Sequence, residues 1–174
     1  MNLARHCNLC DHQKVNLKDG TTCGLTNRKP EFNKTCSKIA LNEKFQNQLK
    51  TVNIEYQKVK RTKTVTYIYF GVFLIIGLAV IIGGYLLGKY AFDSGVVSTV
   101  PLIIMGVGLV PLGMAFGTLN KFHQEVSNTK RKKDTIDEVL NMYRINYEID
   151  IKFGKKYHGT QKVYTDLNVK GLYG

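Results

Sequence analysis

The sequence predicts a mainly α-helical membrane protein built on a two-helix transmembrane hairpin. Two uncharged apolar runs, 64–88 and 94–120, each exceed the roughly 20 residues with which a helix crosses the hydrocarbon core of a bilayer. The residues between them, 89–93, are too few to hold a domain, so they must turn the chain straight back. Basic residues crowd the outer flank of each run. Together, these observations predict a hairpin anchor with both chain ends on one side.

The distribution of charge predicts which side that is. The formal net charge is +12, with 13 Lys/Arg against 5 Asp/Glu in segment 1–63 and 11 against 7 in segment 121–174. Basic residues beside membrane spans are retained in the cytoplasm, so we expect a multi-pass protein with cytoplasmic termini. No nucleic-acid recognition motif accompanies the charge. We therefore expect its partners to be the lipid bilayer and anionic lipid head groups, not nucleic acid.

All four cysteines lie in segment 1–40, which we expect to form a zinc-ribbon-like module. Their spacing is C-x2-C-x12-C-x12-C. Thiols seldom form disulfides in a reducing cytoplasm, and four thiolates suit tetrahedral zinc. We predict a structural zinc site with the ligands Cys7, Cys10, Cys23 and Cys36. A standard ribbon would have a second C-x2-C pair, so three alternatives remain: His6 or His12 in place of one thiolate, redox-active thiols, and no metal.

The order of residues around these cysteines resembles a known arrangement. Cys7-x2-Cys10 is followed by Cys23-Gly24-Leu25-Thr26 and then by Pro30-x-Phe32-x3-Cys36. This pattern resembles the N-terminal module of small uncharacterised two-span membrane proteins of Bacteroidota, and the resemblance covers about residues 7–40. It implies that the four cysteines act together and that the membrane is the bacterial inner (cytoplasmic) membrane. It implies no activity.

The polar segments that flank the spans, 41–63 and 121–144, both have apolar residues at heptad-like spacing. The heptad-like stretches themselves, 41–63 and 121–143, each have 23 residues and run in opposite directions, which predicts that the hairpin continues into the cytoplasm as an antiparallel coiled-coil stalk. We expect this stalk to pack one set of apolar side chains against another, namely Phe45, Val52 and Val59 against Val126, Ile136 and Leu140. The alternative is a pair of amphipathic helices on the membrane surface.

The C-terminal segment, 145–174, predicts a β-hairpin. Apolar residues occupy every second position from Ile145 to Phe153, and a second alternating run covers 163–169, with a turn expected at 154–159. Two strands alone are marginal in water, so they need a surface to cover. The zinc module is the simplest candidate, and the stalk or a partner's sheet edge are the alternatives. We expect His158 to be a solvated turn residue.

Small residues in the spans predict close helix packing. They recur at four-residue spacing, in Ala79-x3-Gly83, Gly84-x3-Gly88 and Gly113-x3-Gly117. Such pairs let helix backbones approach, either within the hairpin or against a partner helix. Pro111 predicts a kink in the second span. Neither span contains Asp, Glu, Lys, Arg or His, which argues against a self-sufficient pump or carrier.

These features favour a non-catalytic role. The sequence has no recognisable nucleophile–base pair, phosphate-binding glycine loop or paired carboxylates, so we do not expect an enzyme. We expect an adaptor, assembly factor or accessory subunit that presents its zinc module to a membrane-protein partner or to itself. The alternative is a homo-oligomeric two-span ion channel with Asp93 at the pore mouth. A thiol or metal sensor is a third hypothesis.

Overall fold

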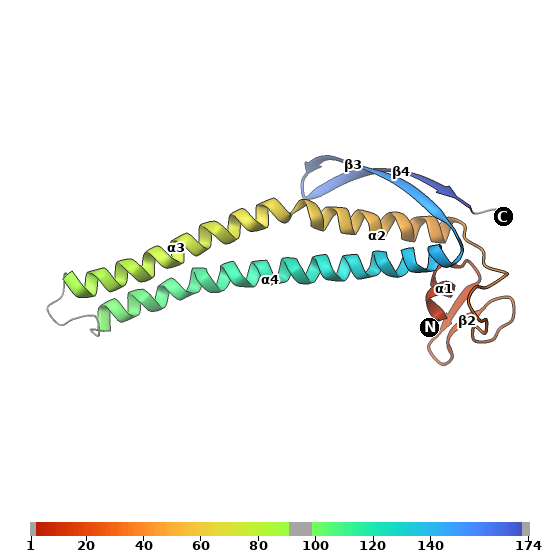
Figure 1. Ribbon diagram of the computed structural model, residues 1–174, viewed down its shortest axis with the longest axis horizontal. Coiled ribbons are helices and arrows are strands. Elements are labelled where there is room, and N and C mark those ends of the chain that lie inside the picture. The colour runs from red at the N-terminus through yellow and green to blue at the C-terminus, as the bar shows by residue number, and fades with distance from the viewer. Residues whose placement is uncertain (1–2, 91–98, 172–174) are drawn as a thin grey trace. The chain divides into compact units, whose positions relative to one another are not determined.

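The computed structural model describes residues 3–90 and 99–171 and is mostly helical, with two small β-hairpins (Figure 1). Its elements, in chain order, are α1 (Ala4–Leu9), β1 (Gln13–Asn16), β2 (Gly20–Cys23), α2 (Glu43–Arg61), α3 (Lys63–Tyr90), α4 (Thr99–Met142), β3 (Asn146–Tyr157) and β4 (Thr160–Lys170). They form two compact units. The first combines residues 1–57 with 128–174, and the second is 58–127.

The two long apolar helices predicted from the sequence are present. α3 has 28 residues and α4 has 44, and each is long and apolar enough to cross a membrane. α4 joins most of the predicted second span to the predicted polar helix without a break, and it continues through Pro111. The first long helix is interrupted where α4 is not: α2 ends at Arg61 and α3 begins at Lys63, with a turn at Thr62 between them.

In the second unit, α3 packs against the N-terminal part of α4 through glycines. A Cβ atom added to Gly77 would lie 2.6 Å from Leu112 Cδ2, and one added to Gly108 would lie 2.7 Å from Ile81 Cγ1. Both distances are shorter than real side chains tolerate, so only glycine permits this approach. An edge-to-face contact between Phe70 and Phe116, with ring centroids 5.4 Å apart, extends the interface.

The small residues singled out in the sequence divide between two faces of this hairpin. Gly84 and Gly88 are buried. At Gly83, Gly113 and Gly117 an added Cβ atom would meet nothing within 4 Å, and Ala79 is exposed. These outward residues do not pack the hairpin itself. Whether they pack a partner helix stays a prediction.

In the first unit, α2 packs against the C-terminal part of α4. The core contains Phe45 and Leu49 from α2, Val139 and Leu140 from α4, and Leu9 from α1, with Ile136 packed at its edge. Phe45 and Leu140 thus share one core with Ile136 at its edge, as predicted, whereas Val52 is half-buried and is not part of this core. Val59 and Val126 belong to the second unit. The coiled-coil geometry itself stays a prediction.

The C-terminal hairpin forms, but its turn differs from the prediction. β3 pairs antiparallel with β4 from Asn146↔Lys170 to Phe153↔Val163, and pairing resumes after a bulge at Lys156↔Gln161. The predicted turn at 154–159 is therefore too long: the bulge lets the strand continue to Tyr157, and the turn itself is only 158–159. The chain reverses at His158 and Gly159, both with positive φ, as a two-residue type I′ turn requires. His158 is exposed, as predicted.

The surface that this hairpin covers also differs from the simplest expectation. Tyr147, Leu167 and Val169 pack against the core that α2 and α4 build, to which the cysteine module adds Leu9 and, at the edge, Ile39. The helix pair, not the cysteine module, is therefore the main support of the hairpin, and Figure 1 shows the strands running beside α2. The helices offer the larger apolar surface, which decides where two marginal strands are stable.

A polar cluster fixes the hairpin to the helices. Tyr147 Oη donates to Asp137 Oδ1 at 2.7 Å, and Asn53 Nδ2 lies 3.4 Å from the same hydroxyl. Lys133 pairs with Asp137 and stands 5.6 Å from the Tyr147 ring centroid. Burial acts to lower the pKa of Lys133, but its hydrogen bonds to Asp137 and Tyr147 outweigh this and raise it. This cluster gives the half-buried Lys133 its partners.

Candidate metal centre at the four cysteines

The first two cysteines are brought together by the end of α1. Cys7 lies in the last turn of this helix, and Cys10 caps it in an extended conformation. The amide of Cys10 donates to the carbonyl of Cys7 at 3.0 Å. This local turn places the two side chains at the same end of the helix, as the C-x2-C spacing predicts.

Cys23 stands at the end of the β1–β2 hairpin, opposite Gln13. Its amide donates to Arg28 O at 2.9 Å, and its carbonyl accepts from Asn27 N at 2.7 Å, so a closed turn comes directly after the strand. Gly24 N donates to His12 O at 2.6 Å, and a Cβ atom at Gly24 would lie 3.0 Å from that oxygen. Glycine after Cys23 therefore permits a close backbone approach.

Cys36 is held by the residue that follows α4. Its amide donates to Tyr143 Oη at 2.8 Å, although the two residues are 107 positions apart in the chain. The loop then turns, with Ile39 N donating to Cys36 O, and Ala40 O accepting from Asp11 N at 2.9 Å. A long loop without regular secondary structure is thus fixed at both of its ends.

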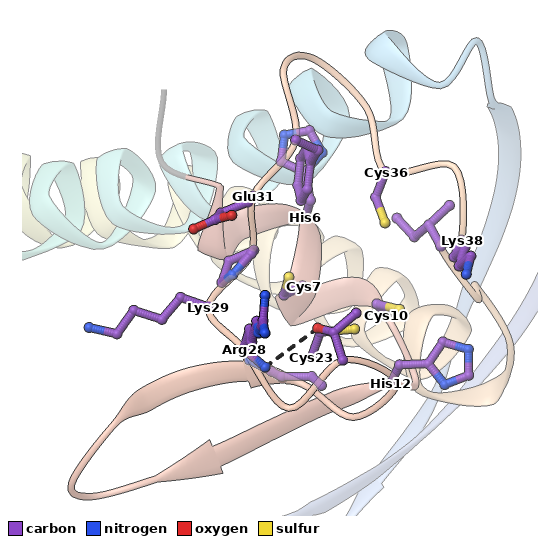
Figure 2. Close-up of a pocket in the computed structure, with 15 residues that line it drawn as sticks. His6, Cys7, Cys10, His12, Cys23, Arg28, Lys29, Glu31, Cys36 and Lys38 are labelled. Carbon is purple, nitrogen blue, oxygen red and sulfur yellow. Dashed lines mark hydrogen bonds between the residues drawn. The ribbon is translucent and has the colours of Figure 1, made fainter.

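All four cysteines line one cavity of about 450 Å³, together with His6 and His12 (Figure 2). Figure 2 shows the four sulfur atoms around the same space, although they come from α1 and its C-cap, from β2 and from the loop before α2. Cys7 and Cys23 are half-buried, as is Cys36, and Cys10 is buried. The sequence-predicted residues are therefore brought together.

Backbone amides point at two of the sulfur atoms. Ala40 N donates to Cys10 Sγ at 3.4 Å. Hydrogen bonds from Leu25 and Thr26 to the Cys23 sulfur lower the pKa of this thiol. Donors of this kind stabilise a thiolate, which is the form that binds metal.

The pKa of the Cys7 thiol is shifted in the opposite direction to that of Cys23. Burial raises the pKa of its thiol, and the negative charges of Cys10, Cys23 and Cys36 raise it further. Four like-charged groups around one cavity repel one another unless a cation is present. The electrostatics of the cavity therefore favour either protonated thiols or a bound positive ion.

The side chains as placed do not form a finished coordination shell. In residues 3–90 and 99–171, no group of three or more His, Cys, Asp or Glu side chains could hold a metal ion. Tetrahedral zinc–thiolate geometry, with Zn–S near 2.3 Å, needs sulfur atoms about 3.8 Å apart. Binding would therefore have to draw the sulfurs inward from the cavity wall.

The two histidines have different surroundings. His6 is 2% exposed, its Nδ1 lies 3.1 Å from Tyr143 Oη, and its ring meets Phe32 edge-on at 5.2 Å between centroids. Burial lowers the pKa of His6, and the charge of Glu138 partly offsets this. His6 is thus packed as a neutral ring between neighbours. His12 is half-buried on the cavity wall.

Sequence reasoning missed the role of Tyr143. Its position in the sequence marks it only as an apolar residue at the end of a heptad-like stripe, yet its hydroxyl contacts both Cys36 and His6. Tyrosine at the end of such a stripe is itself the available signal, since its polar tip needs a partner when the ring is buried. Asp93, the predicted pore-mouth residue, lies outside the described residues.

Comparisons with known proteins do not extend this description. No protein-family model matches the chain, and no curated protein or solved structure matches it significantly. The resemblance to the Bacteroidota module and the four-thiolate ligand set both stay predictions. The function of the chain must therefore be inferred from its own residues and contacts.

Proposed function

We propose that this chain is a non-catalytic adaptor, assembly factor or accessory subunit of the bacterial inner membrane. Two membrane-spanning helices would anchor it, with both termini in the cytoplasm. The first unit would carry a zinc-bound module that is presented to a membrane-protein partner. The observation that carries the proposal is the convergence of all four cysteines on one cavity in a module fixed to the helix pair.

Zinc is the cofactor that this donor set suits best. Four thiolates from sequence-distant positions, with amide donors aimed at Cys10 and Cys23, are typical of structural tetrahedral sites. Binding would offset the mutual repulsion of the thiolates and stabilise a module of about 40 residues, which has little core of its own. Four protein ligands leave no coordination position for substrate, so this zinc would be structural.

Membrane insertion is supported by the exposure of the apolar helices. Only 11% of the most apolar 18-residue window of each long helix is buried within the structure. Ile75 is 69% exposed and Ile103 is 61% exposed, and both lie in the uncharged runs 64–88 and 94–120. The core helix of a soluble protein would bury such side chains, and a surface of this size in water would aggregate. The hydrocarbon core of a lipid bilayer is the environment that suits this exposed apolar surface.

Anionic lipid head groups are the expected contact at the cytoplasmic boundary. Lys58, Lys60, Lys63 and Lys121 are all exposed on the second unit. Lys63 Nζ lies 5.9 Å from the ring centroid of Tyr67, and this ring meets Phe122 edge-on. Lysine beside tyrosine and phenylalanine at the end of an apolar helix is typical of a membrane interface. Each such lysine adds about 1 kcal/mol of attraction to an anionic surface.

The proposal is tested by metal content and topology together. Protein purified in detergent without chelator should contain one zinc per chain, and Cys23→Ser should abolish stable binding, whereas Thr22→Ser, one residue earlier, should not. Reporters fused at residues 1 and 174 should both read as cytoplasmic. Full zinc retention in single Ser variants of all four cysteines would refute the ligand set. A periplasmic reporter at either end would refute the hairpin topology.

A further inference from the structure

The first unit carries a second concave surface, on the helix pair and away from the cysteine cavity. It is an open groove of about 510 Å³, lined by α1, α2 and α4. Its apolar base contains Leu9, Val52 and Ile136. Its basic rim contains Arg5, Arg131 and Lys132, and among the described residues no Asp or Glu lines it. We name this surface the α1–α2–α4 groove.

Two of the three cations on the rim already form ion pairs with carboxylates of the same chain. Arg5 Nη1 lies 3.3 Å from Glu138 Oε2, and Lys132 Nζ lies 3.0 Å from Glu55 Oε2. Both pairs are about half exposed, and exposed ion pairs contribute little to stability because water and salt screen them. A carboxylate from outside could therefore replace either partner at small cost.

Arg131 adds a cation without such a partner. It is exposed, and none of the ion pairs found within residues 3–90 and 99–171 involves its guanidinium group. Arginine binds carboxylates through two parallel N–H donors, which gives direction as well as attraction. The first unit as a whole is strongly basic, so an acidic ligand would also be drawn towards it from a distance.

The apolar base favours an anionic ligand that also carries apolar groups over one that does not. Val52 and Ile136 are half-buried, and they lie one on each of two packed helices, so the base of the groove runs along the helix pair. A polyanion with no apolar groups, such as nucleic acid backbone, would leave this base uncovered. An amphipathic helix, with apolar side chains on one face and carboxylates beside them, would cover the base and meet the rim.

We propose that the α1–α2–α4 groove binds an acidic amphipathic helix of a partner protein. This inference rests on the proposed adaptor role and names the face that the partner would use. Apolar side chains of the partner would cover Val52 and Ile136, while its carboxylates would pair with Arg131, Lys132 and Arg5. Since α1 supplies one wall, the groove is complete only while the cysteine module is docked on the helices.

The test uses the full-length protein in detergent and a displayed library of random 18-residue peptides. Peptides that bind should carry a net negative charge and apolar residues at helical spacing. Their affinity should fall at least tenfold with Arg131→Glu, because a salt-bridging cation becomes a repelling carboxylate. Lys162→Glu, which makes the same charge change on exposed β4, is the matched control and should change it less than twofold.

A second variant avoids any change of charge. Gln48 also lines the groove, and Gln48→Phe should block entry and weaken the same peptides. Zinc content and reporter topology should be normal in both groove variants, so failure of the groove is distinguishable from failure of the adaptor proposal. The inference is overturned if no acidic peptides are selected or if those selected bind Arg131→Glu as well as wild type. It is also overturned if an RNA oligonucleotide or phosphatidylserine vesicles displace them through the same residues.

Discussion

Removing one hydroxyl group, in Tyr143→Phe, should loosen the cysteine module while leaving the helix pair packed. The hydroxyl accepts from the Cys36 amide at 2.8 Å and lies 3.1 Å from His6 Nδ1. Phenylalanine keeps the ring, and with it the edge-on contact to His6 at 5.6 Å between centroids. What is lost is the acceptor for a partly buried amide, and an unsatisfied group of that kind costs about 1–3 kcal/mol.

This cost should be visible as local opening. Hydrogen exchange in segment 4–41 should accelerate by about 5–150-fold, the factor that corresponds to 1–3 kcal/mol. Exchange in the core of α2 around Phe45 and Leu49 should change little, because these side chains are held by α4 and not by the hydroxyl. The measurement is hydrogen–deuterium exchange with mass spectrometry on the full-length protein in detergent, read peptide by peptide.

Tyr157→Phe is the matched control, since it removes the same atom from a residue that is 74% exposed beside the β-hairpin turn. It should leave exchange in segment 4–41 unchanged. The reasoning is refuted if Tyr143→Phe also leaves that segment unchanged, because the hydroxyl would then not hold the module. It is equally refuted if α2 and segment 4–41 accelerate together, because the loss would then be global.

Contacts within each of the two units lead to three further predictions. Gly77→Leu should separate α3 from α4, lowering the melting temperature in detergent and the yield of an engineered cross-link between them. Gly117→Leu should do neither, because its Cβ atom has open space; equal losses would contradict this contrast. Phe45→Ala should destabilise the first unit by about 3–5 kcal/mol in denaturant unfolding, since the side chain is fully buried. Finally, burial raises the pKa of Tyr147 and hydrogen bonds raise that of Lys133. The unfolded chain then releases these protons first, so stability should fall as pH rises above about 10, and less steeply in Tyr147→Phe. An identical alkaline profile in this variant would contradict the assignment.

The features that the sequence predicts well are those that a repeating pattern encodes. Apolar residues at every second position place Ile149 and Leu167 on one side of a hairpin, and heptad-like spacing places Phe45 and Leu140 in a shared core. In both cases periodicity alone determines which side chains share a face. The two apolar runs likewise predict two long helices, because their length and lack of charge leave few other structures.

The features that the sequence predicts less well depend on which of several similar helix faces packs against a neighbouring helix. Gly113 and Gly117 have the same four-residue spacing as Gly84 and Gly88, yet only the latter pair is buried within the hairpin. The glycines that make the closest approach, Gly77 and Gly108, carry no partner at that spacing, so no motif marks them. The rotation of one helix against another is decided by three-dimensional packing, which a motif in one helix does not contain.

The cysteine module illustrates the same distinction within a single site. Its spacing predicts that Cys7 and Cys10 lie together, because a helix end and one turn fix both within four residues. Nothing local predicts that Cys36 is positioned by Tyr143, because that hydrogen bond joins segments 107 residues apart. The position of Cys36, and with it the shape of the cavity, depends on α4 as well as on the cysteines. A zinc site in this chain would for that reason report on the packing of the first unit: ligand geometry and helix packing stabilise each other, and neither is complete in residues 1–40 alone.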